Sequence, residues 1–278
     1  MAEAKPAPDL DEPFRYPSET PGYLRLRLRT RVEVFKGTDI WHQVFVDKWS
    51  SVLETAILLC DLWEKHWCVA ASERVDRMVP TVDSVISAAR NLGVQIIHCP
   101  SGTVDKYADT VFRKRIQNVP RVALPTPMDL SAPPLPFSDS DDGCESGEGS
   151  YDPGTKQHPG ISIAGNDVIS DDGEEIYSFL RRRGLRHLII MGVATNVCVM
   201  NRTFGIKQMT SMGVRCTLVR DLTDAWYNPQ NPPYVSNETA TDLVAQYIEK
   251  YWCPSILSSD LVKAYKSTSQ EAPELDAQ

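Results

Sequence analysis

The hydrophobic and polar positions of the chain follow two periodic patterns, and the first of them lies near the N-terminus. From Leu24 to Val34, apolar residues alternate with four arginines and a glutamate, which is the period-two pattern of a half-buried strand. We interpret the charged positions as a solvated face and not as a phosphate site, because charge runs are usually solvated. This strand is predicted to be an addition to the main core.

From Thr55 onward, short apolar runs alternate with stretches of helical periodicity. The apolar runs predict strands at residues 55–61, 94–98, 187–191, 214–219 and 255–257, and the helical stretches cover residues 72–92, 172–183, 197–212 and 238–251. Pro80 should start or bend the first helix, and Gly93 is placed to cap it. The alternation predicts a Rossmann-like three-layer α/β/α fold, in which helices cover both faces of a parallel sheet. In such sheets, ligands bind beyond the carboxyl ends of the strands.

These patterns divide the chain into four parts. Residues 1–22 form a Pro-rich acidic lead that we expect to be poorly ordered, 23–53 a strand extension, 54–260 the main α/β domain, and 261–278 a tail. The main domain is interrupted at residues 119–160 by a loop with many prolines and an acidic run at residues 138–150. A loop of this length is a lid, a binding loop or disorder. We interpret its acids as solvated, because they lack the regular spacing of a calcium loop.

Composition excludes several classes of protein. A hydrophobic fraction of 42% with 24% charged residues is typical of a globular protein, and a net charge of -8 opposes binding to nucleic acid. The sequence lacks the run of about 20 apolar residues that a membrane span requires. The N-terminus does not resemble a signal peptide, so we expect a cytoplasmic protein. The seven cysteines are odd in number and widely spaced, so we expect them to be reduced and to form no zinc framework.

Three reactive side chains follow predicted strands or the long loop: Asp61, Lys156 and Cys198. Cys198 would open a helix, where the positive end of the dipole favours a thiolate. Asp61 would take the thiol proton, Lys156 would hold both anions, and the backbone N–H groups of Ala194 and Cys198 would receive an oxyanion. Each residue also has an ordinary structural interpretation: Cys198 as a buried apolar group, Asp61 as a helix cap and Lys156 as a surface lysine. The alternative lysines are Lys65, Lys106 and Lys114.

The segment 192–199, Gly-Val-Ala-Thr-Asn-Val-Cys-Val, resembles the nucleophile loop of the isochorismatase-like hydrolases, a family that includes nicotinamidases and several carbamoyl and ureido amidohydrolases. The resemblance covers about residues 54–257. Asp61 matches the family's strand-ending acid, and Lys156 precedes Cys198 by a separation similar to that of the family's lysine and cysteine. The resemblance implies a cis peptide between Val193 and Ala194, a small-molecule substrate and a homo-oligomer.

Further polar and aromatic residues lie near these positions. Trp63, His66, Trp67 and Asn196 are candidates for the walls of a substrate pocket, and core packing is the alternative for the large rings. His98 and Asp105 lack the Asp-x-His spacing of the metal site in similar nicotinamidases, so we predict neither a metal nor a cofactor. A further group lines either the crevice or a subunit contact; it comprises Asp221, Asp224, Trp226 and Tyr227.

The resemblance implies a hydrolase that cleaves a small amide, ureido or carbamoyl carbon–nitrogen bond through a thioester at Cys198. Similar enzymes that split the vinyl ether of isochorismate can lack the cysteine, so its presence favours an amidase. One alternative is a catalytically silent relative that binds a metabolite or acts as a scaffold. Another is a thiol redox sensor.

Overall fold

A computed structural model describes residues 22–130, 133–138, 143–146 and 156–266 of the chain. Within these residues nine strands form one sheet in the order β2-β1-β8-β7-β6-β3-β4-β5, and β9 pairs with β1. The strands are β1 (Gly22–Glu33), β2 (Trp41–Ser51), β3 (Thr55–Cys60), β4 (Gln95–Cys99), β5 (Val168–Ile169), β6 (His187–Val193), β7 (Arg215–Asp224), β8 (Ser255–Ile256) and β9 (Ala264–Lys266). The lead predicted at residues 1–22 lies almost wholly outside the described residues.

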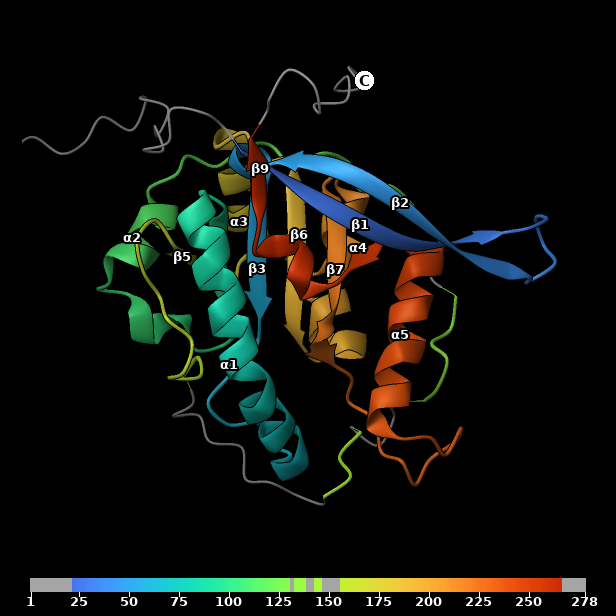
Figure 1. Cartoon of the computed structure of the whole chain (residues 1–278). Helices are drawn as coiled ribbons and strands as arrows, with labels where there is room; N and C mark the ends of the chain where they lie inside the picture. Colours follow the sequence, from blue (N-terminus) through green and yellow to red (C-terminus); the bar gives the residue numbers. More distant parts are fainter. Residues whose placement is uncertain (1–21, 131–132, 139–142, 147–155, 267–278) are drawn as a thin grey trace, which may run out of the picture.

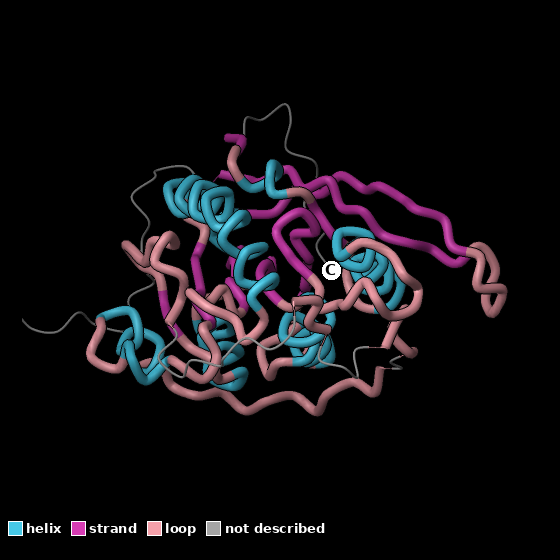
Figure 2. The backbone as a smooth tube through the Cα atoms, turned by 90° about the horizontal axis from the view of Figure 1, so that it is seen from below, coloured by secondary structure: helices cyan, strands magenta, loops and turns pink. Residues whose placement is uncertain are grey.

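The six strands from β8 to β5 run parallel to one another, and β1 pairs antiparallel with β2, β8 and β9. The helices are α1 (Val69–Leu92), α2 (Val111–Gln117), α3 (Gly173–Arg182), α4 (Ile206–Ser211) and α5 (Asn237–Tyr251). Figure 1 shows β3 ending at the lower edge of the sheet, and Figure 2 views the molecule from that edge, with helices on both sides of the strands. The predicted α/β fold class is therefore confirmed.

Alternate residues of the central strands serve two separate cores, as the pleat of a sheet requires. Ile57 and Leu59 of β3 pack in one core with the apolar side of α1, while Ala56 and Leu58 pack in the other with α3, α4 and α5. All four side chains are fully or almost fully buried. This is why the run from Thr55 is continuously apolar: both of its faces are covered.

One predicted helix is wrong in the structure. In place of a continuous helix over residues 197–212, the chain makes a π-helical turn, η3 (Thr195–Val199), and the regular helix α4 begins only at Ile206. The first helix is confirmed with a start three residues earlier than predicted, at Val69, and Gly93 caps it at a positive φ of 101°. Pro80 lies inside α1, so it does not start the helix.

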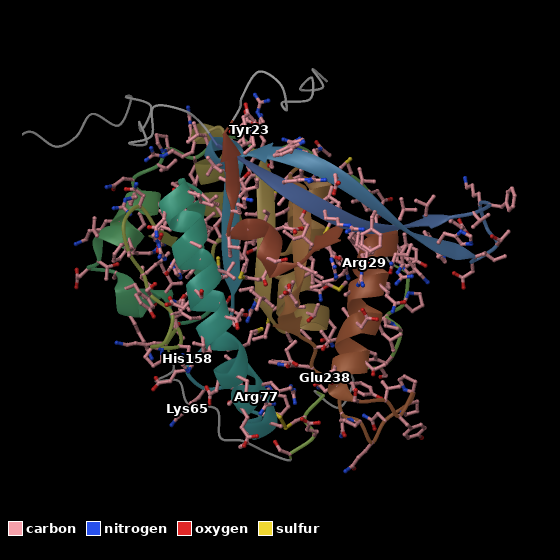
Figure 3. The ribbon with its side chains drawn as sticks, viewed as in Figure 1. Tyr23, Arg29, Lys65, Arg77, His158 and Glu238 are labelled. Atoms are coloured by element: carbon pink, nitrogen blue, oxygen red, sulfur yellow. A yellow bond between two sulfur atoms is a disulfide. The ribbon has the colours of Figure 1, made fainter. Side chains whose placement is uncertain are left out.

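The N-terminal extension is a hairpin that is continuous with the main sheet. β1 pairs with β2 over eleven residues and with β8 at Arg29, and Figure 1 shows the hairpin extending past α5. The prediction of a solvated arginine face is wrong for Arg29 and Arg31, whose side chains are only 14% and 15% exposed beside the buried carboxylate of Glu249. Figure 3 shows Arg29 on the hairpin near α5.

The C-terminal part differs from the predicted tail at its beginning. Residues 264–266 form β9 on β1, so the sheet continues beyond residue 260. No helix within the described residues has the length and hydropathy needed to cross a membrane.

Candidate active site

The carboxyl ends of β3 and β6 place Asp61 and Cys198 beside each other. The chain leaves β3 at Asp61 with a positive φ of 49°, and the Asp61 N–H donates to the carbonyl of Cys99, 3.0 Å away. In β6, Gly192 lies so close to β3 that an added Cβ would be 2.1 Å from the carbonyl oxygen of Cys60. The peptide between Val193 and Ala194 is cis, as the resemblance implies. The turn η3 follows directly and carries Cys198.

The buried carboxylate of Asp61 has three partners. The Cys198 thiol lies next to it, so that each of the two groups shifts the pKa of the other. The backbone N–H of Ser101 donates to Oδ1 at 2.8 Å, and Nε of Arg202 donates to Oδ2 at 3.1 Å. Burial raises the pKa of Asp61, while Arg202 and the hydrogen bonds from Ser101 and Cys198 lower it. Arg202 thus supplies the countercharge that a buried carboxylate requires.

The environment of Cys198 raises the pKa of its thiol, which is the opposite direction from the predicted thiolate. Burial and the adjacent Asp61 carboxylate raise the pKa of the Cys198 thiol to about 12, although Arg202 and the backbone N–H of Ala194 lower it. Cys198 lies near the end of η3 and not at its start, so the prediction that it opens a helix is wrong. Desolvation and the neighbouring negative charge therefore determine the direction of its pKa. The resting site therefore favours a neutral thiol next to a carboxylate, and the proton must leave the sulfur as it attacks.

Lys156 is not brought to this pair. Its side chain is exposed, and its backbone carbonyl accepts from the N–H of Glu64 at 2.8 Å. Among the described residues, the ion pair on Asp61 comes from Arg202. The alternative lysines Lys65, Lys106 and Lys114 are also exposed. A catalytic role for Lys156 stays a prediction.

Arg202 is the residue of the site that the sequence analysis missed. Its backbone N–H donates to the carbonyl of Cys198 at 3.1 Å, so it lies one helical turn after the nucleophile. The four-residue spacing could have indicated that Arg202 lies beside Cys198, because residues four apart on a helical turn share a face.

The predicted wall residues form an aromatic cluster next to the pair, together with Trp226. The ring centroids of Trp63 and His66 lie 5.1 Å apart, those of His66 and Trp226 6.5 Å, and those of Trp67 and Trp226 5.6 Å. Asn196 holds Trp226 in place: its side-chain amide donates to the Trp226 carbonyl at 3.1 Å and accepts from the Trp226 N–H at 2.9 Å. The cluster is thereby attached to the turn of Cys198.

A second charge group borders the aromatic cluster. Nε of Arg74 donates to both carboxylate oxygens of Asp224 at 2.9 Å, and the Arg74 guanidinium also binds Glu145. Burial and Glu145 raise the pKa of Asp224, while Arg74 lowers it. The remaining members of the group around Trp226 lie elsewhere, since Asp221 accepts from Ser258 and Tyr227 is buried against Phe137.

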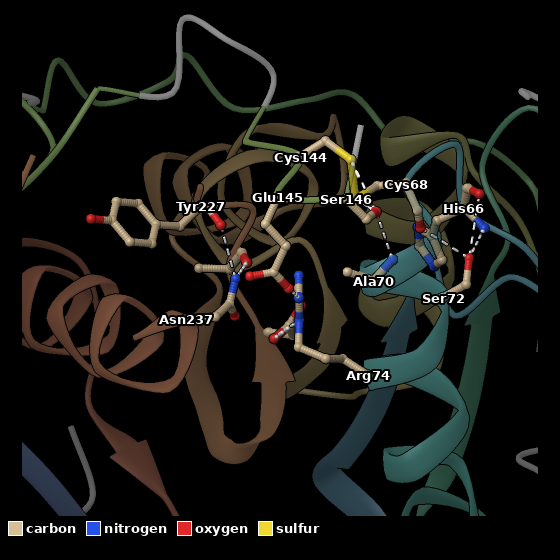
Figure 4. The surroundings of a disulfide bond; sticks show 12 residues. His66, Cys68, Ala70, Ser72, Arg74, Cys144, Glu145, Ser146, Tyr227 and Asn237 are labelled. Atoms are coloured by element: carbon tan, nitrogen blue, oxygen red, sulfur yellow. Dashed lines mark hydrogen bonds and ion pairs between the residues drawn. A yellow bond between two sulfur atoms is a disulfide. The ribbon is translucent and has the colours of Figure 1, made fainter. Parts of the chain in front are cut away.

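Residues 143–146 of the acidic loop cover this region (Figure 4). Cys144 forms a disulfide with Cys68, so the prediction that all seven cysteines are reduced is wrong. The Ser146 hydroxyl accepts from the N–H of Ala70 at 3.1 Å, and a Cβ on Gly143 would lie 2.6 Å from the backbone of Trp226. Most of the remaining acidic run lies outside the described residues.

The histidine considered as a metal ligand makes hydrogen bonds within the protein. His98 is fully buried between Gln157, at 2.8 Å from Nδ1, and Asp167, at 3.0 Å from Nε2, whereas Asp105 is exposed. Within the described ranges, no three His, Cys, Asp or Glu side chains gather as a metal site would require.

The comparisons with known proteins give structural similarity at low identity. No family model matches the chain. No curated protein matches it either. A cysteine hydrolase from Pseudomonas syringae is 17% identical over 76% of this chain and 92% of its own, with a TM-score of 0.49. An isochorismatase from Pseudomonas putida is 13% identical over 76% and 91% of the two chains, with a TM-score of 0.47. An isochorismatase family protein from Burkholderia thailandensis is 15% identical over 76% and 94%, with a TM-score of 0.42.

Proposed function

We propose that the chain is a cysteine hydrolase that cleaves a small amide, ureido or carbamoyl carbon–nitrogen bond, with Cys198 as nucleophile and Asp61 as base. The observation that supports this proposal is the position of the Cys198 thiol next to the buried carboxylate of Asp61, which Arg202 neutralises. A weak nucleophile becomes reactive when a base lies within reach of its proton.

The reaction proceeds in two halves. Asp61 takes the thiol proton as the sulfur attacks the substrate carbonyl, and the departing amine takes that proton when the carbon–nitrogen bond breaks, which leaves a thioester. Water then attacks the thioester, Asp61 takes its proton, the acid is released and the sulfur recovers the proton. The Ala194 N–H faces the Cys198 sulfur, which supports its role as a donor to the oxyanion.

The buried thiol argues against the redox-sensor alternative at Cys198. Redox-sensing cysteines have a low pKa and are accessible, whereas Cys198 is 4% exposed and its pKa is raised. We also propose that the substrate is a small molecule and that the chain forms a homo-oligomer.

Intact-mass spectrometry during turnover of a panel of amides, ureido acids and carbamoyl acids tests the mechanism, with isochorismate alongside. We expect product and a transient acyl adduct on Cys198 in the wild type, and neither in Cys198→Ala. Cys216→Ser is the matched control, because Cys216 is buried to a similar extent but lies at the amino end of β7, away from the carboxyl ends of the strands that place Asp61 and Cys198. If no member of the panel yields product or adduct with folded protein, the hydrolase proposal fails. The alternative, a catalytically silent relative that binds a metabolite, then replaces it.

A further inference from the structure

A short segment of the acidic loop, residues 143–146, lies at the carboxyl edge of the sheet, and we call it the strap. Its Cys144 forms the disulfide with Cys68, which directly precedes α1, and Figure 4 shows this bond beside the first turn of that helix. Next to the disulfide, Gly143 packs on the backbone of Trp226, which follows β7. The strap therefore connects the start of α1 with the segment that follows β7.

The backbone on which the strap lies is bonded to the turn that carries Cys198. The Asn196 side chain donates to the Trp226 carbonyl at 3.1 Å and accepts from the Trp226 N–H at 2.9 Å. Asn196 lies in η3, two residues before Cys198, which is 4% exposed while the disulfide is closed. A Cβ on Gly143 would lie 2.6 Å from the Trp226 backbone, so the contact is close. Release of the strap would therefore remove a support of Trp226 and, through Asn196, of the Cys198 turn.

Two polar contacts tie the strap to α1 in addition to the disulfide. The Ser146 hydroxyl accepts from the N–H of Ala70 at 3.1 Å, and Glu145 forms an ion pair with Arg74. Arg74 is already neutralised by Asp224, whose two carboxylate oxygens both lie 2.9 Å from its Nε. The departure of Glu145 would therefore leave no unpaired cation. Single hydrogen bonds and partly exposed ion pairs contribute little, so the covalent bond is what holds the strap on α1.

The surroundings of the disulfide favour its reduction from one side. Cys68 is 2% exposed and Cys144 is half-buried, so an incoming thiolate approaches the Cys144 sulfur and the Cys68 sulfur leaves. Cys68 is the N-cap residue of α1, whose first turn carries no acidic residue, and the positive end of a helix dipole stabilises a thiolate there. The Ser146 hydroxyl oxygen lies 3.4 Å from the Cys68 sulfur and can donate its proton to that thiolate. A stabilised leaving thiolate makes a disulfide easier to reduce.

We propose that the Cys68–Cys144 disulfide is a redox-active modification site, and that its reduction by a dithiol releases the strap and exposes the Cys198 turn. One thiolate of the dithiol attacks the Cys144 sulfur, and Cys68 leaves as a thiolate and takes up a proton. The second thiol of the reductant then attacks the mixed disulfide, so that Cys144 also becomes a thiol and the dithiol becomes a disulfide. Two electrons and two protons pass to the protein, and an oxidised dithiol reverses the exchange. This proposal does not depend on the reaction that Cys198 performs.

The rate at which dithiothreitol reduces the disulfide in the folded protein tests the redox activity, with acid quenching and peptide mass spectrometry as the readout. We expect complete reduction without denaturant, and about fivefold slower reduction in Ser146→Ala, which lacks the hydroxyl beside the leaving sulfur. Ser211→Ala is the matched control, because the Ser211 hydroxyl donates to the carbonyl of Gln208 in α4 at 2.8 Å. A disulfide that resists dithiothreitol until the protein unfolds, or equal rates in all three proteins, would overturn the proposal.

Release of the strap is measured by the rate at which iodoacetamide labels Cys198 at pH 9. The oxidised protein is compared with the reduced protein, freed of dithiothreitol, and with the double variant Cys68→Ser/Cys144→Ser. We expect about tenfold faster labelling of Cys198 in both open forms. The rate at Cys216, at the amino end of β7, should not change. Equal acceleration of both cysteines would indicate general unfolding, and an unchanged rate at Cys198 would show that the strap does not cover its turn; either result contradicts the proposal.

Glu145→Gln separates the disulfide from the ion pair of the strap. This variant keeps both cysteines and removes the charge that faces Arg74, so we expect its oxidised form to label at Cys198 at the rate of the oxidised wild type. Reduction should then accelerate the labelling by the same factor in both proteins. If Glu145→Gln is labelled as fast as the double variant while its disulfide is intact, the ion pair holds the strap and the proposal is wrong.

Discussion

The guanidinium of Arg202 lies 3.1 Å from the carboxylate of Asp61 through both Nε and Nη2. The two residues are 141 positions apart, and their pairing lets a carboxylate sit fully buried next to a thiol. A carboxylate in this position without the arginine would tend to take up a proton, and a protonated Asp61 cannot accept one from Cys198. Arg202 is therefore a positioning residue for the proposed base.

Replacing Arg202 by methionine should lower kcat/KM by about 100-fold. Because Arg202 lowers the pKa of Asp61, its loss should also move the acidic limb of the pH–rate profile to higher pH. Arg202→Lys should recover part of the activity, since it restores the charge but not the two-point contact.

Lys156→Met is the informative comparison for this prediction. The Lys156 side chain is exposed, so its loss should change kcat/KM only slightly and leave the acidic limb in place. A large loss in Lys156→Met with little change in Arg202→Met would restore the triad that the sequence predicted.

The parts of the fold that sequence reasoning found are those with a local pattern. β3 is buried on both faces and reads as a continuous apolar run, and the Cys198 turn carries a distinctive motif. The strand β2 escaped prediction because its burial does not alternate: Phe45 and Val46 are neighbours and are 44% and 49% exposed. The alternation in β1 was recognised, yet it extends past the core, and Val32 is 52% exposed.

The site residues that the sequence did not predict depend on contacts between distant segments. Arg202 is recognisable as a site residue only once β3 and η3 lie side by side, and the disulfide joins cysteines 76 positions apart. The same holds for Arg29 and Arg31, which look like a solvated face until α5 brings Glu249 beneath them. Sequence periodicity reports which face is apolar but not which polar groups will meet.

Glu249 anchors the hairpin to the main domain, and Glu249→Gln should lower the free energy of unfolding by about 3 kcal/mol. Its side chain is fully buried, with Oε1 2.6 Å from Nε of Arg29 and Oε2 3.3 Å from Nε of Arg31. Removing the negative charge leaves the partly buried guanidinium of Arg29 with only the exposed Asp242 as an ion-pair partner, and it removes the carboxylate that Arg31 faces. Urea unfolding followed by circular dichroism measures the loss.

The matched control for this prediction is Asp47→Asn on the same hairpin. Asp47 lies 2.8 Å from Arg25, and the two side chains are 47% and 52% exposed. Exposed ion pairs contribute at most about 1 kcal/mol. If both variants are destabilised equally, Glu249 is not the anchor.

Reduction of the Cys68–Cys144 disulfide should also destabilise the fold. The bridge closes a long loop with a sequence separation of 76, and constraint of the unfolded chain by such a loop contributes up to about 4 kcal/mol. Urea unfolding with and without dithiothreitol measures the difference. A variant with both cysteines changed to serine should show no further effect of the reductant, and a similar effect in that variant would assign the destabilisation to another cause.

The raised pKa of Cys198 predicts an unusual response of its alkylation to pH and to mutation. In the wild type the thiol pKa is about 12, so the rate of alkylation by iodoacetamide should keep rising beyond pH 10 without a plateau. Because the Asp61 carboxylate raises that pKa, Asp61→Asn should speed alkylation at pH 8 while it abolishes turnover. Peptide mass spectrometry reports the rate at each cysteine. Cys216 is the internal control, since burial raises its pKa to about 12 without any contribution from Asp61. Slower or unchanged labelling of Cys198 in Asp61→Asn would show that the carboxylate does not hold the thiol in its neutral form.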